Sequence, residues 1–208
     1  MSLSEGLADG LAELGIDVPE SEQVRLIQYL GLIEKWNKVH NLTAIRDPQQ
    51  MLAHHLLDSL GVLPHLETVQ SLVDVGSGAG LPGIPLAIVR PDLAVALLDS
   101  SHKRLAFQQQ CKTELGLINV TAIHSRVEDY QSRSGFDVVI SRAFSDLSEF
   151  VQAARHLCTK QGRMLAMKGL YPHEEVTKLP ADVRVTQVTE LRIPGLNANR
   201  HLLEIKVN

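Results

Sequence analysis

Residues 72–80 have the sequence LVDVGSGAG, and residues 81–89 continue it with LPGIPLAIV. The apolar residues at the start, with one aspartate among them, predict a short buried strand, and the glycines that follow predict a tight turn. A helix should begin at Leu81-Pro82, because proline is tolerated in a first turn whose amides have no partner within the helix. Such a turn lets a ligand approach the backbone closely, with free amides facing it. The stretch therefore predicts a nucleotide-binding turn.

The glycine spacing narrows the choice of nucleotide. A dinucleotide-binding GxGxxG turn would need its third glycine at position 81, which is Leu81. The spacing of Gly76, Gly78 and Gly80 is instead typical of folds that bind S-adenosylmethionine (SAM). By itself the turn also fits a ligand-free connection, but the next apolar run, residues 94–98, ends in Asp99. A carboxylate about 20 residues after the turn can accept hydrogen bonds from ribose hydroxyls, so the two signals together predict an adenosine-containing cofactor.

Strand and helix patterns alternate from residue 71 onward, which predicts right-handed crossovers and a parallel sheet covered on both faces. The predicted strands are residues 72–75, 94–98, 119–123, 136–140 and 163–167. The predicted helices are residues 82–90, 101–115 and 146–157, with a shorter one after Pro172. Residues 183–191 and 201–207 alternate as strands, and the link between them is too short for a crossover helix. They should form an antiparallel hairpin at the edge of a seven-stranded, mostly parallel α/β sheet.

The first 70 residues have helical patterns. Leucines at helical spacing end at Gly15, a second amphipathic stretch follows Pro19, and a third helix should begin at Asp47-Pro48 and end near Gly61. We therefore divide the chain into an N-terminal helical extension, residues 1–70, and a cofactor-binding domain, residues 71–208.

Composition indicates a globular enzyme without a membrane span or signal peptide, since 44% of the 208 residues are hydrophobic and no apolar run reaches 18 residues. Cys111 and Cys158 have no motif partners, which indicates reduced thiols in a cytoplasmic protein. The net charge is −4, but residues 99–168 hold ten Lys and Arg against seven Asp and Glu. Because the local field decides phosphate binding, this basic region could contact nucleic acid.

Ligands of such sheets bind beyond the carboxyl ends of the strands. The residues expected there after the third, fourth and fifth strands include Arg126, Val127, Glu128, Arg142 and Lys168. The sequence SRAF after the fourth strand lacks the proline-aromatic motif of amino-group methyltransferases, no cysteine nucleophile is expected at this rim, and no zinc spacing is present. Methyl transfer to an atom that is already nucleophilic remains, and guanine N7 is such an atom. It needs positioning and no general base.

The blocks NKVHNLTAIRDPQQMLAHHLLDS, LVDVGSGAGLPGIPLAI, LLDSSHKR, SRVEDY, VISRAF, MLAMKG and NRHLLEIK together resemble the bacterial RsmG/GidB family of 16S ribosomal RNA guanine-N7 methyltransferases. The resemblance implies a Rossmann-like class I SAM-dependent fold with a helical N-terminal extension. It also implies the site residues, which divide by ligand group. Gly76, Gly78, Gly80 and Leu81 would line the methionine side of SAM, Asp99 would bind the ribose, Val127 and Glu128 would lie along the adenine, and Arg142 would lie beside cofactor and base.

Our mechanistic hypothesis is direct displacement, in which Arg142 and Lys168 orient the base while Arg126 and Arg200 contact phosphate. The expected partner is 16S rRNA or the 30S subunit, and the expected enzyme is a cytoplasmic monomer without a metal. Three alternatives stay open at this point. They are a SAM-dependent methyltransferase with a small-molecule or protein substrate, a nicotinamide-dependent oxidoreductase, and a Rossmann-like module that binds RNA or protein without catalysis.

Overall fold

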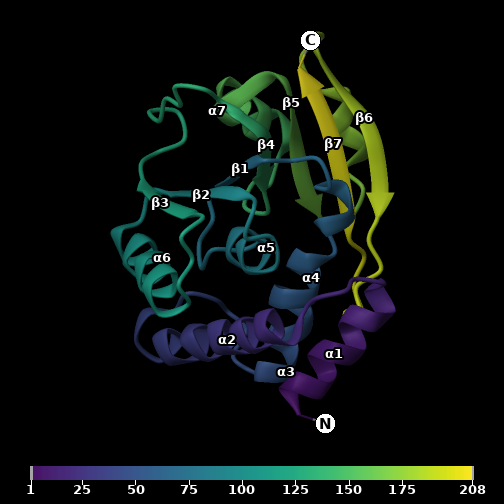
Figure 1. Ribbon diagram of the computed structural model, residues 1–208. Helices are drawn as coiled ribbons and strands as arrows, with labels where there is room; N and C mark the ends of the chain where they lie inside the picture. The colour runs from purple at the N-terminus through teal and green to yellow at the C-terminus, as the bar shows by residue number, and fades with distance from the viewer. Residues whose placement is uncertain (1, 208) are drawn as a thin grey trace.

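The computed structural model describes residues 2–207 and is built around a seven-stranded sheet with the order β3-β2-β1-β4-β5-β7-β6 (Figure 1). The strands are β1 (Ser71–Val75), β2 (Ala94–Asp99), β3 (Val120–His124), β4 (Phe136–Ser141), β5 (Cys158–Lys168), β6 (Val183–Glu190) and β7 (His201–Val207). Strands β1 to β5 are parallel to one another, whereas β7 runs antiparallel to both β5 and β6. The predicted seven-stranded α/β fold with its C-terminal hairpin is confirmed.

Helices cover both faces of this sheet. The N-terminal helical segments are α1 (Leu3–Leu14), α2 (Glu20–His40), α3 (Pro48–Met51), η1 (Leu52–Leu57), α4 (Asp58–Leu60) and η2 (Leu63–His65). The later ones are α5 (Gly83–Val89), α6 (His102–Glu114), α7 (Leu147–Ala154), η3 (Arg155–Leu157) and α8 (His173–Thr177). Helix α1 has the predicted end, since Gly15 is left-handed with φ of 67° and bonds back to the last turn.

Alternate residues of the strands face two apolar cores. Leu72 of β1 belongs to the core that contains α1 to α6, whereas Val73 faces α7 and the hairpin. The larger core is continuous across residue 70, because one apolar cluster contains residues from both sides of it. In addition, the buried hydroxyl of Tyr29 on α2 donates to the carbonyl of Ala79 in the glycine turn at 2.6 Å. The domain boundary near residue 70 stays a prediction, and the helices before it support the turn directly.

The third predicted helix is not uniform. It begins with the predicted cap, where the Asp47 side chain accepts the N–H of Gln49, but residues Leu52–Leu57 form a π-helix between α3 and α4. The N–H of Asp58 consequently bonds to the carbonyls of Ala53 and His55. In a regular α-helix it would bond four residues back, to His54. Short π-helical turns inside α-helices are frequent at functional sites.

Two other predicted elements differ in their bounds. Helix α5 begins at Gly83, with Pro82 at its N-cap, because the amide of Gly83 turns onto the carboxylate of Asp74 at 2.9 Å. Strand β5 begins at Cys158, and its pairing with β4 shifts between the partners of Phe136 and Val138. Its first half contains the polar sequence TKQG, which an apolar pattern does not detect.

Candidate active site

Three neighbouring cavities lie beyond the carboxyl ends of the parallel strands, where the strand order reverses between β1 and β4. The rim cavity, ≈ 240 Å³, is lined by residues that follow β1, β2, β3 and β4: Gly76, Asp99, Ser100, Arg104, Ser125, Arg126, Val127, Glu128, Ala143 and Phe144, with Val75 and Leu98. The glycine-turn cavity, ≈ 170 Å³, is lined by Leu42, Thr43, His55, Gly76, Ser77, Gly78, Ala79, Leu81, Arg142 and Ala143. The arginine cavity, ≈ 400 Å³, is lined by Thr43, Ala44, Ile45, His54, His55, Asp58, Arg142, Met167, Lys168, Gly169 and Arg200.

The cavities share residues and therefore form one continuous site. Gly76 and Ala143 line both the rim cavity and the glycine-turn cavity. Thr43, His55 and Arg142 line both the glycine-turn cavity and the arginine cavity. A ligand that fills the first two would therefore end beside whatever occupies the third.

Gly76 keeps the first of these passages open. Its φ of 68° is in the left-handed region, and a Cβ at this position would lie 2.8 Å from the Cβ of Ala143. The turn is supported from below by the buried Gln108 of α6, whose amide donates to the hydroxyl of Ser77 and to the carbonyl of Gly78, both at 2.9 Å. A close approach of ligand to backbone is thus built into the turn.

The prediction of free amides in this turn is wrong for five of residues 76–81. The amides of Gly76, Ser77, Gly78, Gly80 and Leu81 all bond within the protein: the first two to the Leu98 carbonyl, the third to Asp99, and the last two to the Ser77 carbonyl. Among residues 76–81 of the described chain, only the amide of Ala79 has no such bond, so the turn offers a phosphate few donors. It suits a ligand without phosphates that packs against the backbone.

Asp99 lies at the floor of the rim cavity and is buried. Its carboxylate accepts the amide of Gly78 at 2.8 Å, the amide of Ser101 at 2.9 Å and the guanidinium of Arg104 at 3.3 Å. A carboxylate can accept about four hydrogen bonds, and the Arg104 side chain is 45% exposed, so it can yield to a competing donor. Asp99 can therefore accept from a hydroxyl pair in the cavity.

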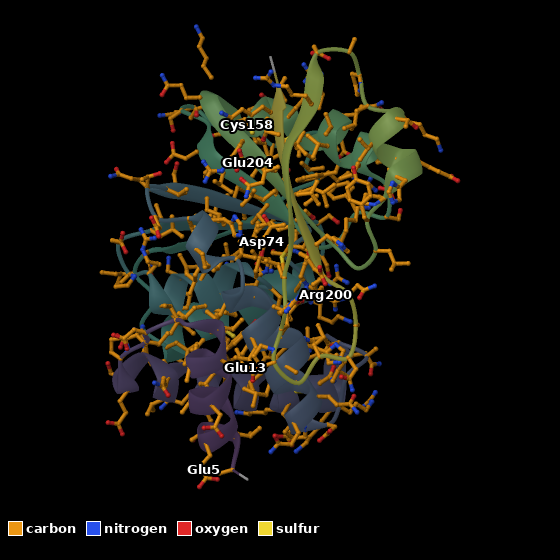
Figure 2. All side chains as sticks on the ribbon, turned by 90° about the vertical axis from the view of Figure 1, so that its right-hand side faces the viewer. Glu5, Glu13, Asp74, Cys158, Arg200 and Glu204 are labelled. Carbon is orange, nitrogen blue, oxygen red and sulfur yellow. The ribbon has the colours of Figure 1, made fainter. Side chains whose placement is uncertain are left out.

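Asp74 lies behind the turn, deep in the protein (Figure 2). Its Oδ2 accepts the amide of Gly83, and within residues 2–207 its buried Oδ1 has no partner. Burial raises the pKa of Asp74 to about 7, against the opposing effects of the Gly83 hydrogen bond and the charge of Arg142. Through its bond to the amide of Gly83, the Asp74 side chain of β1 holds the first residue of α5 against the strand that precedes the glycine turn.

Sequence reasoning missed the residue that organises the arginine cavity, Asp58. Its Oδ2 lies 3.0 Å from Nη1 of Arg142, and its Oδ1 lies 2.8 Å from Nε of Arg200. Arg200 precedes β7, where the chain returns from the helical layer toward the sheet (Figure 2). The available signal was an acid in the otherwise apolar sequence MLAHHLLDSL. A buried carboxylate requires a cationic partner, but the sequence does not indicate which residue provides it.

His55 contributes a neutral side chain to the site. Its Nε2 lies 3.1 Å from the hydroxyl of Thr43, and burial, together with the charge of Arg142, lowers its pKa to about 4. His55 therefore acts as a packing and hydrogen-bonding side chain. Across residues 2–207 the structure contains no group of three or more His, Cys, Asp or Glu side chains that could hold a metal.

The other predicted rim residues divide into two kinds. Arg126, Val127 and Glu128 line the rim cavity, and Arg126 is exposed. Lys168 lines the arginine cavity, but its ammonium is held by the carbonyls of Phe144 at 3.2 Å and Ser145 at 2.7 Å and by Glu175 at 2.8 Å. Lys168 therefore fixes the loop after β4, next to Arg142.

Comparison with known proteins identifies the family of this chain. The model of the GidB family, described as rRNA small subunit methyltransferase G, matches residues 22–203. The chain belongs to this family. It is 55% identical to the ribosomal RNA small subunit methyltransferase G of Nitrosospira multiformis over 99% of this chain and 98% of that protein. The corresponding protein of Aromatoleum aromaticum is 52% identical over 97% and 98%.

Solved structures support the fold. TrmN from Thermus thermophilus superposes with a TM-score of 0.59 at 15% identity, over 76% of this chain and 53% of that chain. The S-adenosylmethionine-dependent methyltransferase SibL superposes with a TM-score of 0.58 at 17% identity, over 83% of this chain and 61% of that chain. The predicted family, class I methyltransferase fold and SAM cofactor are confirmed, while the roles of individual site residues stay predictions.

The residues of this GidB family member fit SAM. The rim and glycine-turn cavities together reach the size of about 300 Å³ or more that is usual for small-molecule sites. They meet at Gly76, where any larger residue would close the passage. The nicotinamide-dependent oxidoreductase and the non-catalytic module are set aside by membership of a methyltransferase family.

Proposed function

We propose that this chain transfers a methyl group from SAM to N7 of a guanine in the 16S rRNA of the small ribosomal subunit. The observation that carries the proposal is the junction at Arg142, where the glycine-turn cavity opens into the larger arginine cavity. A cofactor in one cavity and a base in the other would meet at this side chain. The family match and the identity of 50% or more to rRNA methyltransferases support the RNA substrate.

The cofactor would be held by the residues that line the first two cavities. Gly76, Gly78 and Leu81 would pack along its methionine end, and Asp99 would accept from the ribose. Gly80 lines neither cavity, because its open side faces Ile84 of α5, so its predicted contact with the cofactor is replaced by a role in the turn. Val127 and Glu128 would lie along the adenine, at the far end of the rim cavity. When bound, SAM supplies an electrophilic methyl group on a positively charged sulfur.

The protein's contribution would be positioning. Guanine N7 carries a free lone pair and loses no proton on methylation, so no general base is required. His55, with its pKa lowered to about 4, stays neutral near pH 7 and adds no charge beside the sulfonium. Arg142 would align the base against the methyl group, and Lys168 would act by holding the loop that carries Arg142. Arg126 and Arg200, at the rim and the arginine cavity, would contact RNA phosphates.

We further propose a cytoplasmic monomer that needs no metal. Direct methyl displacement requires no Lewis acid, and ribosomal RNA is modified where ribosomes assemble. No helix within residues 2–207 is long and apolar enough to cross a membrane.

The test is incubation with tritiated-methyl SAM and either 30S subunits or free 16S rRNA from cells that lack this protein, followed by nucleoside analysis. We expect label in 7-methylguanosine, and the better substrate will show whether the enzyme needs the assembled particle. Arg142→Ala should abolish most of the label while Arg155→Ala, which alters the surface pair with Asp182, should not. Label in another nucleoside, or full activity of Arg142→Ala, would contradict the proposal.

Salt provides a second test of the RNA contacts. Phosphate contacts release counterions, so affinity for rRNA should fall steeply between about 50 and 200 mM salt. A flat dependence would argue against Arg126 and Arg200 as phosphate contacts. SAM binding without any label in RNA would favour the alternative, a methyltransferase with a small-molecule or protein substrate.

A further inference from the structure

Asp58 joins two arginines from distant parts of the chain beneath the arginine cavity. The carboxylate is 1% exposed, and its two oxygens are divided between Nη1 of Arg142 at 3.0 Å and Nε of Arg200 at 2.8 Å. Bonds between ionised partners of this kind are strong and directional. With an arginine on each oxygen, Asp58 is placed to hold these groups and not to take a proton from substrate.

The backbone completes this clamp at Arg142. Nη1 of Arg142 also donates to the carbonyl of His54 at 3.0 Å. In a regular α-helix this carbonyl would accept the amide of Asp58, but in the π-helical segment η1 that amide bonds to Ala53 and His55 instead. Both hydrogens of Nη1 thus have acceptors, which fixes the plane of the guanidinium. Within residues 2–207, Nε and Nη2 of Arg142 have no acceptor, and Arg200 uses only Nε and Nη1, the latter on the Asn199 carbonyl.

We infer that Asp58 is a positioning residue that fixes Arg142 and Arg200 at the arginine cavity, so that the free N–H groups of Arg142 select a base with an acceptor at position 6. This inference rests on the proposed function and names how its substrate is chosen. Guanine presents O6 next to N7, whereas adenine presents an amino group at the same place. A donor placed on O6 holds guanine while leaving the N7 lone pair free to attack.

Charge supports the same arrangement. Two guanidiniums that line one cavity repel each other, and the carboxylate between them offsets this repulsion. Removing the carboxylate would leave two uncompensated charges in a partly buried site. Lys168, the third cation of the cavity, is already neutralised by Glu175. Without Asp58, Arg142 and Arg200 would turn outward, and the cavity would lose its fixed donors.

The first experiment compares Asp58→Asn with Asp182→Asn, a matched change in the surface pair with Arg155. Asp58 lines neither cofactor cavity and can act on SAM only through Arg142, so the affinity for SAM, measured by calorimetry, should change far less than kcat/KM in Asp58→Asn and stay unchanged in Asp182→Asn. For methylation of 30S subunits, kcat/KM should fall on the order of 100-fold in Asp58→Asn alone, since misplacement by about 1 Å can cost that much. Unchanged kcat/KM in Asp58→Asn would overturn the inference.

Base selection separates positioning from general damage. With subunits in which the labelled guanine is replaced by adenine, the wild-type protein should bind about 5- to 150-fold more weakly, the range of discrimination that one base-reading pair provides. In Asp58→Asn this guanine-to-adenine ratio should fall toward one. A ratio that stays at the wild-type value would show that Asp58 does not govern selection.

A third readout needs no RNA and no activity, so it distinguishes failure of this inference from failure of the proposed function. In ¹H–¹⁵N spectra of the free protein, the Nε–H of Arg200 should give a sharp, slowly exchanging signal, assigned by its absence in Arg200→Lys. The signal should broaden in Asp58→Ala, with Asp58→Asn as the second variant if the alanine protein does not fold. A signal that stays sharp in both variants would refute the clamp.

Discussion

Replacing Asp74 by asparagine should make the stability of this protein less dependent on pH. Asp74 is fully buried, and burial raises its pKa from 3.8 to about 7. In the unfolded chain it loses its proton near pH 4, whereas the folded protein keeps that proton up to about pH 7. Between these values the folded state holds one more proton than the unfolded state, so the free energy of unfolding decreases as pH rises. The contribution of this carboxyl is most favourable below pH 4 and is lost through pH 7.

The size follows from the shift. A displacement of about three pKa units corresponds to a penalty of about 4 kcal/mol above pH 7, which accumulates at about 1.4 kcal/mol per pH unit. Asparagine is uncharged and retains an oxygen for the amide of Gly83. The difference in stability between Asp74→Asn and wild type should therefore grow in favour of the variant by about 2–3 kcal/mol from pH 5 to pH 7 and level off above pH 8.

The assay is urea unfolding of both proteins at pH 5, 6, 7 and 8. All other titrating groups are common to the two proteins, so subtraction isolates Asp74. Asp182→Asn serves as the control. The hydrogen bond from Arg155 lowers the pKa of Asp182, which therefore stays ionised throughout this range and should give a flat difference. A difference between Asp74→Asn and wild type that is also flat would refute the reasoning.

Two further substitutions test the supports of the glycine turn. Gly76→Ala places a methyl group 2.8 Å from the Cβ of Ala143 and should weaken SAM binding at least about tenfold by calorimetry, whereas Gly31→Ala, with open space around it in α2, should leave SAM affinity unchanged and raise stability by up to about 1 kcal/mol. Tyr29→Phe leaves the carbonyl of Ala79 without its buried donor and should lower the free energy of urea unfolding by about 1–3 kcal/mol. Equal SAM affinity in the two alanine variants, or an unchanged Tyr29→Phe midpoint, would contradict these assignments.

The fold was predictable where an apolar strand pattern is followed by turn-forming glycine or proline residues. Strands β1, β2 and β4 are short apolar runs, buried on both faces, and the glycine turn follows the first of them. The π-helical segment was not predictable, because its apolar residues fit an α-helix equally well and the deviation depends on contacts made from outside the helix. The first half of β5 was missed because its polar residues pair with β4 through an irregular register.

The residues that line the site were predictable from the strand ends, but the side-chain contacts among them were not. The rule that ligands lie beyond the carboxyl ends of parallel strands brings Asp99, Arg126 and Arg142 to one site without any knowledge of side-chain direction. Asp58 lies outside that rule, since it belongs to a helix that packs on the sheet. Its bonds reach 84 residues along the chain to Arg142 and 142 residues to Arg200, distances over which one sequence carries no pairing signal.

The contrast between Asp58 and Lys168 shows what positions Arg142. Asp58 and the carbonyl of His54 hold the guanidinium itself, whereas Lys168 holds the backbone two and three residues further along, at Phe144 and Ser145. Neither contact is local in sequence, and each uses a charge that would be costly to leave unpaired in a partly buried site. Arg142 is therefore fixed from two sides before any ligand arrives. A preorganised donor costs no reorganisation at the moment of reaction, and this is what the proposed direct displacement would require of the protein.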